Sequence, residues 1–428
     1  MKANESVKNY PSSLRMYTNY TVREIKKVCK TFGPRASAYD AERKAQEHFA
    51  EEMKTCADDV KLEDFDVHPL AFMSWIVIDG ILALLALVFS FLKLPVVSVV
   101  LIAIALVCMF CEFLMYWEFL DPLFPKRKSC NVVGKRTPTG EVKQRIIFSG
   151  HVDSSYEWTY THLGGKGLLF TVGIYGVVGM LYVFVVSLIT TIAKGPVGAE
   201  VDGFLEVLKY IQLAFAPGFI LVMFFVNFKL PVEGANDNLT GAVTSIAVLK
   251  YLEDNNITFE HTEVVAMTAG CEESGLRGSR AYTKAHIDEL KEIPTVFFGM
   301  DTLRDYEDMA IYSRDMTGTV KTDPRVCALM KKAARLTGID LPYASVYLGA
   351  SDAAAVTKLG VPAATLAAMN PGPPKYYHTR EDTADNMVPK TIEKGLDICL
   401  QALFLYDEAG LRDSYDDIEG FETEFDGK

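Results

Sequence analysis

The sequence lacks the paired cysteine motifs from which small proteins build structural zinc sites. Its eight cysteines are scattered, and the only close pair, Cys108 and Cys111, lies inside an apolar run. No second C-x-x-C pair accompanies it, which argues against a zinc ribbon. Scattered single cysteines in a chain of 428 residues are typical of a reducing compartment rather than of a disulfide-bonded secreted protein.

Two further absences narrow the class of protein. The first residues, M-K-A-N-E-S-V-K-N-Y-P, contain no apolar stretch, so we expect no secretory signal peptide. The chain also lacks an excess of positive charge, because its formal net charge is −12. This balance argues against a general nucleic-acid-binding protein.

Long apolar stretches are what the sequence has in abundance, and they occur in two pairs. They span residues 70–92 and 95–111, then 167–193 and 210–228. Each is about long enough to cross a bilayer as a helix, and none has a polar stripe that would face water. Asp79 interrupts the first stretch and Pro217 the fourth. We predict two transmembrane helical hairpins; the alternative is two apolar hairpins buried in a large soluble protein or an oligomer.

Outside these stretches, helical and strand patterns alternate along the chain. The patterns predict helices at 14–31, 37–56, 238–255, 325–338 and 389–410, and strands at 60–67, 261–269, 294–301 and 361–369. S-C-N-V-V-G-K-R and Q-R-I-I-F-S-G, which are separated by a T-P-T-G turn, are interpreted as two strands of one hairpin. The alternation predicts an α/β fold with a mostly parallel mixed sheet flanked by helices.

Acids and histidines occur where apolar strands end, which is where binding crevices form in such sheets. They are His151, Asp153, Asp237, Glu272, Glu273, Asp301 and His378. Taken singly, each has an ordinary structural explanation, and Asp237 before a helix is a typical N-cap. Taken together, two histidines and three acids form a ligand set for two divalent ions that share one carboxylate. One carboxylate beyond these five is then free to move protons.

Five ordered motifs carry a resemblance to a known family. H-V-D-S, G-A-N-D-N-L-T-G, C-E-E-S-G-L-R-G-S, the strand-end Asp301 and Y-Y-H-T-R-E-D-T resemble the co-catalytic di-zinc aminopeptidases. Bacterial leucine aminopeptidase and aminopeptidase S belong to this family, with glutamate carboxypeptidase and glutaminyl cyclase as relatives. The resemblance implies a zinc exopeptidase-like fold that covers most of the chain outside the apolar pairs.

The resemblance also implies a ligand set for two Zn²⁺ ions. Asp237 would bridge the two metals, His151 and Asp301 would complete one site, and Glu273 and His378 would complete the other. Zinc accepts this mixture of imidazole and carboxylate ligands, and cobalt or manganese would fit similar ligands.

The remaining roles carried over from the family are catalytic and substrate-binding. Glu272 would be the general base, and Asp153 would orient the imidazole two residues before it. Asp352 lies in G-A-S-D-A-A-A, which resembles a family segment that lines the site, although alanine follows it where many members have histidine. Tyr376 or Tyr377 would help to hold the tetrahedral oxyanion.

These roles predict a peptidase domain that the apolar hairpins interrupt. The domain would comprise residues 1–69, 120–165 and 230–411, with one hairpin at 70–119, a second at 166–229, and an acidic, disordered tail at 412–428. Positive residues near the span ends are Lys126, Arg127, Lys128, Lys166 and Lys229 on the peptidase side, against Lys93 and Lys194 in the inter-span turns. This bias predicts a multi-pass cell-membrane protein with a cytoplasmic catalytic domain.

The predicted function is that of a zinc-dependent aminopeptidase, with a peptide as substrate, the lipid bilayer as partner and no nucleic acid. One alternative is a carboxypeptidase-type or glutaminyl-cyclase-like relative. Another is a non-catalytic, membrane-anchored protein that binds peptides. The presence of all five ligand residues favours two metals and hydrolysis, whereas the preferred substrate residue and the oligomeric state stay open.

Overall fold

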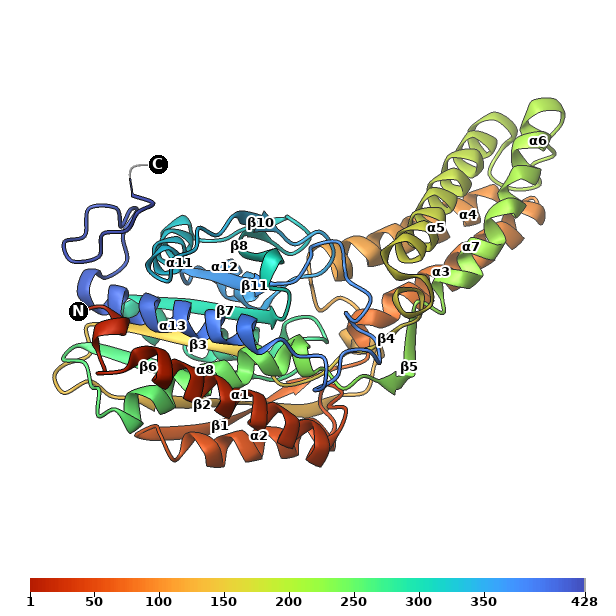
Figure 1. The fold of residues 1–428 in the computed structure, drawn as a ribbon. Coiled ribbons are helices and arrows are strands. Elements are labelled where there is room, and N and C mark those ends of the chain that lie inside the picture. Colours follow the sequence, from red (N-terminus) through yellow and green to blue (C-terminus); the bar gives the residue numbers. More distant parts are fainter. Residues whose placement is uncertain (427–428) are drawn as a thin grey trace.

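The computed structural model describes residues 1–426 and has an α/β body from which a helical bundle projects (Figure 1). Within these residues a nine-stranded sheet has the order β1-β2-β6-β3-β7-β11-β8-β10, and β9 pairs with β8. The strands are β1 (Asp59–Val67), β2 (Arg127–Arg136), β3 (Gln144–His151), β6 (Thr262–Ala269), β7 (Thr295–Leu303), β8 (Met309–Asp315), β9 (Val320–Lys321), β10 (Tyr343–Ser345) and β11 (Ala363–Ala368).

The centre of the sheet is parallel and antiparallel pairs flank it on both sides, while the edge strand β10 runs parallel to β8. Strand β3 runs parallel to β6 and β7, and β7 runs parallel to β11. Strands β1, β2 and β6 pair antiparallel on one side, and β8 pairs antiparallel with β11 on the other. The prediction of a mixed sheet with a mostly parallel centre is therefore confirmed.

Buried side chains alternate between the two faces of this sheet. Ile146 and Phe148 pack into one core with helices α1 (Tyr10–Phe32), α2 (Asp40–Met53), α8 (Thr240–Asp254), α11 (Pro324–Leu336) and α13 (Pro389–Ala409). Ile147 packs into the opposite core with α9 (Arg277–Ala285), α10 (Ile287–Glu292) and α12 (Asp352–Lys358). Because both faces are covered, the central strands are apolar almost throughout.

The predicted hairpin of β2 and β3 is wrong. Strand β2 pairs with β1 and β6, and β6 lies between β2 and β3. The T-P-T-G turn joins two strands that are neighbours in sequence but not in the sheet. Nearly all of β3 is buried, so it gains more by pairing on both sides with the buried strands β6 and β7.

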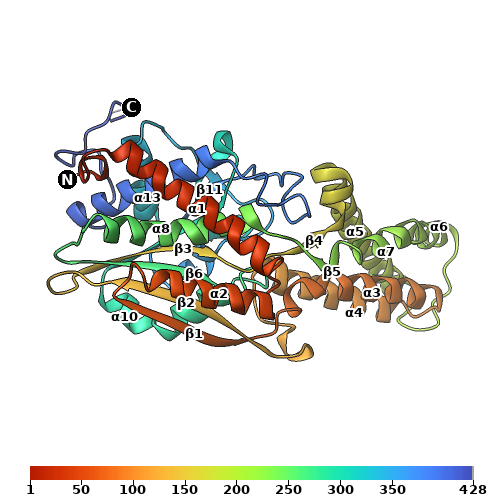
Figure 2. The same cartoon turned by 60° about the horizontal axis from the view of Figure 1, so that its bottom comes forward.

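The helical bundle consists of α3 (Ala71–Phe91), α4 (Pro95–Met109), α5 (Thr159–Lys194), α6 (Gly203–Ile211) and α7 (Ala216–Val222). A π-helical turn (Phe110–Leu114) continues α4. Both views show the bundle projecting from the end of the body near the short strands β4 (Tyr156–Trp158) and β5 (Val226–Pro231) (Figures 1 and 2). The first three predicted apolar stretches fall on α3, α4 and α5.

The fourth apolar stretch differs from its predicted limits of 210–228. The helical run there begins at Gly203, passes through a 3₁₀ turn (Gln212–Phe215) and ends at Val222. Residues 226–231 instead form β5, which pairs antiparallel with β4. Phe225 packs its ring on Trp158 with centroids 5.1 Å apart. The apolar residues at the end of this stretch therefore connect the bundle to the body and are not part of the helical run.

The acidic tail was expected to be disordered, and this is wrong for residues 412–426. Tyr415 and Phe421 are each 2% exposed and belong to the main core. Lys332, itself 2% exposed, lies 2.7 Å from the carboxylate of Asp426. Two aromatic side chains and one buried cation therefore hold a segment whose composition alone suggested disorder. The last two residues of the predicted tail, 427 and 428, lie outside the described residues.

Candidate metal centre

Four of the predicted site residues lie together because their strands are parallel. His151 is the last residue of β3, and Asp301 lies near the end of β7. Glu272 and Glu273 follow β6 in a turn. Since β3, β6 and β7 run in the same direction, their carboxyl ends meet at one edge of the sheet.

Asp237 reaches this edge from the segment between β5 and α8. The carboxylate of Asp382 accepts the main-chain N–H of Asn236 at 2.9 Å and that of Asp237 at 3.0 Å. These bonds hold the irregular turn Ala235–Leu239 against the loop that carries His378. Two loops distant in sequence are thus joined directly behind the site.

The imidazole rings of His151 and His378 lie against different oxygens of the Asp237 carboxylate. Nε2 of His151 lies 3.2 Å from Oδ1 of Asp237, and Nε2 of His378 lies 3.0 Å from Oδ2. Nε2 of His378 is also 3.2 Å from Oε1 of Glu273. The ligand atoms of His151, Asp237 and Asp301 lie within 4.8 Å of one another, and so do those of Asp237, Glu273 and His378. Asp237 therefore belongs to both groups and lies between them.

The acid–imidazole cluster (His151, Asp237, Glu272, Glu273, Asp301 and His378) is withdrawn from water. Burial raises the pKa of Glu272 and that of Asp301 well above their ordinary values. Burial also disfavours the ionised form of Asp237, but the two imidazoles beside it hold its pKa below the usual range. Burial opposes protonation of His378, yet the carboxylates of Glu273 and Asp237 raise its pKa to about 10. Four carboxylates so close together require positive charge.

The residues present fit two divalent cations. Oδ2 of Asp237, Oε1 of Glu273 and Nδ1 of His378 are buried without a hydrogen-bond partner among the described residues. Both oxygens face the interior of the acid–imidazole cluster, as their distances to Nε2 of His378 indicate. Carboxylate oxygen and imidazole nitrogen are donors that zinc accepts. Cations at these positions would use the unpaired oxygens and offset their charge.

Asp153 contacts the cluster differently from the sequence-based expectation. Nδ1 of His151 lies 3.1 Å from the main-chain oxygen of Asp153 and 3.5 Å from its carboxylate. The carboxylate accepts the main-chain N–H groups of Glu272 and Glu273 at 3.0 and 3.1 Å and the hydroxyl of Ser37 at 2.7 Å. The carbonyl therefore takes the imidazole N–H, and the side chain fixes the turn with the two glutamates.

Two charged residues that support the site were not singled out from the sequence. Arg35 is fully buried and donates hydrogen bonds to the main-chain oxygens of Val152 and Gly234. These two bonds link the segment that follows β3 to the segment that follows β5. Glu42 accepts the main-chain N–H of Cys271 at 2.8 Å, one residue before Glu272. Arg35 follows the helix-ending G-P, and Glu42 lies on an amphipathic helix. Both therefore have the sequence signature of ordinary surface residues.

The three predicted substrate contacts are placed differently. Tyr377 stacks on His378 with ring centroids 3.8 Å apart. The hydroxyl of Tyr376 instead donates to Asp305 at 2.8 Å, and its ring lies against Arg304, so it points away from the cluster. Asp352 begins α12 and is 6% exposed, and burial raises its pKa to about 6. The structure thus brings Tyr377 to the cluster and directs Tyr376 elsewhere.

Residues 222–403 match the model of peptidase family M28. This segment belongs to peptidase family M28. The matched M28 segment includes Asp237, Glu272, Glu273, Asp301 and His378, whereas the strand that carries His151 precedes it. The comparison with curated protein sequences gives no match.

Solved structures share the fold of this chain over about nine-tenths of its length. A zinc aminopeptidase from Bacillus subtilis is 15% identical with a TM-score of 0.54, over 90% of this chain and 94% of that one. An aminopeptidase from Aneurinibacillus sp. strain AM-1 is 14% identical with a TM-score of 0.53, over 91% and 93% of the two chains. A glutaminyl cyclase from an Acidobacteriales bacterium is 14% identical with a TM-score of 0.53, over 92% and 96%. At these identities the likeness establishes the zinc exopeptidase fold.

Proposed function

We propose that the M28 segment and the strands before it form a metal-dependent aminopeptidase that hydrolyses N-terminal residues from peptides. The observation that carries the proposal is the position of Asp237, with one oxygen facing His151 and the other facing His378. A carboxylate so placed, with Asp301 and Glu273 on either side, suits a bridge between two zinc ions. Bound there, the ions would act as Lewis acids toward the amide carbonyl and the attacking water.

Glu272 is the proposed general base. Its carboxylate lies 3.7 Å from Nε2 of His151, and its ligand atom is within 4.8 Å of those of His151 and Glu273, so it lies beside the proposed metal ligands. Burial raises its pKa, which makes the carboxylate a better proton acceptor than it would be in water. In this role Glu272 accepts the proton of the attacking water and returns it to the leaving amine. Tyr377 would hold the developing oxyanion, and Asp352 would line the site.

The helical bundle is proposed to span a membrane. Four helices of the described chain, Ala71–Phe91, Pro95–Leu114, Thr159–Lys194 and Gly203–Val222, are long and apolar enough to do so. Their outward surfaces carry large apolar side chains, such as Ile104 at 46% exposure, Ile192 at 78% and Phe204 at 75%. A water-facing surface of this kind would be costly. The more positive peptidase side supports a cytoplasmic body and a multi-pass topology.

The test uses the full chain purified in detergent. Metal analysis is expected to find about two divalent ions per chain, since two ligand groups share Asp237. Amino-acid nitroanilides with a free amine are expected to be hydrolysed, while N-blocked nitroanilides are not. Cyclisation of glutaminyl peptides without hydrolysis would instead indicate a glutaminyl-cyclase-like relative. Release of C-terminal residues would indicate a carboxypeptidase, and metal binding with no turnover would indicate a peptide-binding protein.

A further inference from the structure

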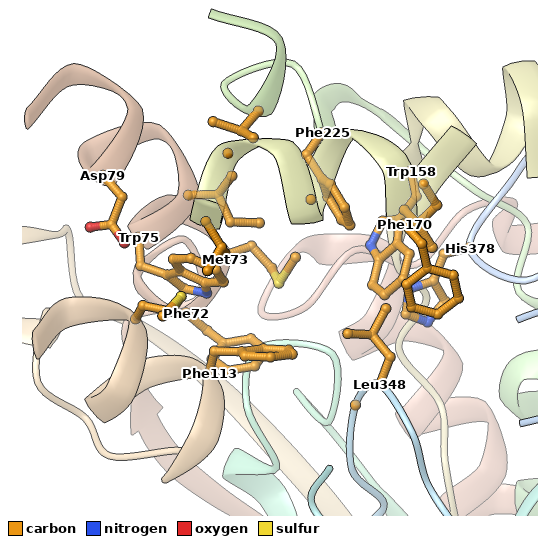
Figure 3. Close-up of a pocket in the computed structure, with 18 of the residues that line it drawn as sticks. Phe72, Met73, Trp75, Asp79, Phe113, Trp158, Phe170, Phe225, Leu348 and His378 are labelled. Atoms are coloured by element: carbon orange, nitrogen blue, oxygen red, sulfur yellow. The ribbon is translucent and has the colours of Figure 1, made fainter. Parts of the chain in front are cut away.

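A cavity of about 360 Å³ extends from the acid–imidazole cluster into the helical bundle. Glu272, Glu273 and His378 line one end of it. The walls come from the body, from α3, α4, α5 and α7 and from the π-helical turn after α4, and include Phe72, Trp75, Leu169, Phe170, Phe225 and Leu348. Figure 3 shows Trp158 and Phe170 beside His378 at one end and Asp79 at the opposite end. The volume is in the range of small-molecule sites.

The cavity is elongated along α3. Phe72 and Asp79, which both line it, are seven residues apart on this helix, a rise of roughly 10 Å. Trp75 and Met73 lie between them in the view of Figure 3. The lining is almost wholly aromatic or aliphatic between the cluster and Asp79. An extended apolar group can therefore lie along it in contact mainly with apolar side chains.

The cavity also reaches the outer surface of α5. Ile174 and Val178 line it, yet they are 60% and 48% exposed. Both lie within the apolar run that we propose to cross the bilayer. An apolar chain can pass from lipid into the cavity at this point. The polar backbone of a peptide cannot, because its amide groups would lose their hydrogen bonds.

From this we infer that the substrate is an amphiphilic amide whose terminal residue carries a long apolar chain, which lies in the cavity while the rest of the peptide leaves toward water. The inference rests on the proposed aminopeptidase activity and names its substrate class. The terminal residue is the part that enters the cavity, because the chain beyond the scissile bond is polar. The bilayer is the source of this substrate, since the cavity opens among lipid-facing residues.

Asp79 limits the length of that chain. It is 3% exposed, and neither carboxylate oxygen has a hydrogen-bond partner within residues 1–426. A chain that reaches Asp79 places apolar atoms against a carboxyl group that has no polar partner among those residues, which is unfavourable. The preferred chain therefore ends short of this residue. Replacement by leucine removes the restriction and extends the apolar wall.

The test uses the metal-loaded full chain in bilayer nanodiscs with nitroanilides of alanine and of straight-chain 2-amino acids up to twelve carbons. Each added methylene should raise kcat/KM about fourfold until the cavity is filled, which corresponds to about 0.8 kcal/mol. In Asp79→Leu the longest chain of the series should gain at least about tenfold relative to alanine. Chain-length independence in the wild-type protein would overturn the inference.

Two glycines of α5 provide a matched pair of variants. Gly173 lines the cavity, and no heavy atom of residues 1–426 outside its own stretch of helix lies within 4 Å of a Cβ added there, so phenylalanine can enter the space. Gly167 is equally open to a side chain but is not among the described residues that line the cavity. Gly173→Phe should lower the ratio of long-chain to alanine kcat/KM at least about tenfold. Gly167→Phe should leave that ratio unchanged.

The two proposals fail in different ways. Hydrolysis of the alanine substrate without a rise along the series, or an unchanged ratio in Gly173→Phe, overturns the inference and leaves the aminopeptidase intact. Absence of hydrolysis for every substrate overturns the proposed function itself. Gel filtration shows whether Gly173→Phe folds. If it does not, Asp79→Leu provides the test, because an unaltered dependence of kcat/KM on chain length in that variant also contradicts the inference.

Discussion

The buried carboxylate of Asp153 accepts the main-chain N–H of Glu272 at 3.0 Å, which ties the proposed general base to the end of β3. The same carboxylate accepts the N–H of Glu273 at 3.1 Å. One side chain thereby sets the position of two neighbouring glutamates with different proposed roles. The position of Glu272 relative to the proposed metal ligands therefore depends on the turn that Asp153 holds, and not on the two glutamates alone.

Asp153→Asn is expected to lower kcat/KM by about 10- to 100-fold and to weaken metal binding. An amide has one acceptor oxygen and would direct an N–H₂ group at one of the backbone donors. Steady-state kinetics and metal titration measure both effects. Ser37→Ala is the control, because it removes a donor to the same carboxylate and leaves both backbone bonds, so its effect should be smaller. Equal losses in the two variants would contradict this role of Asp153.

Glu272→Gln is expected to retain metal and fold while kcat falls by about 10²- to 10⁴-fold, the usual contribution of general acid–base catalysis. The isosteric amide cannot accept the proton of the attacking water. Metal analysis and thermal unfolding check the first part, and nitroanilide kinetics check the second. Normal turnover by this variant would show that another group is the base.

Removal of metal by a chelator is expected to abolish hydrolysis and to lower the melting temperature. The buried carboxylates of the acid–imidazole cluster then lose the cations that offset their mutual repulsion. Differential scanning fluorimetry with and without chelator measures the shift, and added Zn²⁺ should restore both properties. Unchanged activity after the bound metal has been shown to be removed would refute the metal-dependent mechanism.

Arg35→Ala is expected to destabilise the folded state by about 3 kcal/mol or more, because it leaves buried carbonyl groups without donors. Its side chain donates to Val152 and Gly234, so the loss should also weaken metal binding. Thermal unfolding and metal titration measure the two effects. Arg43→Ala is the control, since Arg43 is 40% exposed and pairs with surface acids. Its loss should cost no more than about 1 kcal/mol.

Thiol labelling is expected to place the body and the tip of the bundle on opposite sides of the membrane. All eight native cysteines are buried in the described chain, so an introduced thiol dominates the signal. Val197→Cys, at a position 66% exposed between α5 and α6, should react with an impermeant maleimide in intact cells. Lys54→Cys, on the body, should react only after permeabilisation. Reaction of both thiols, or the reverse pattern, would contradict the proposed topology.

Much of the fold and of the candidate site was predictable from sequence because the signals are local. Apolar runs such as 261–269 and 294–301 correspond to buried strands, and the acids and histidines that follow them lie at one edge, as parallel strands require. The prediction of a β2–β3 hairpin was wrong because β6, a strand distant in sequence, pairs between them. The prediction of a disordered tail was wrong for residues 412–426 because composition does not reveal that Tyr415 and Phe421 pack into the core.

Residue types and their order determined, by sequence alone, an α/β body, a candidate ligand set and two pairs of long apolar stretches. Only the tertiary structure decided that Tyr377 lies against the site while its neighbour Tyr376 points elsewhere. It alone also decided that the main-chain oxygen of Asp153 accepts the N–H of the His151 imidazole. It also decided that the helical bundle and the body together line a cavity leading to the acid–imidazole cluster. The physical reason is that side-chain direction and enclosure arise from contacts between segments far apart in the chain, which no local pattern encodes.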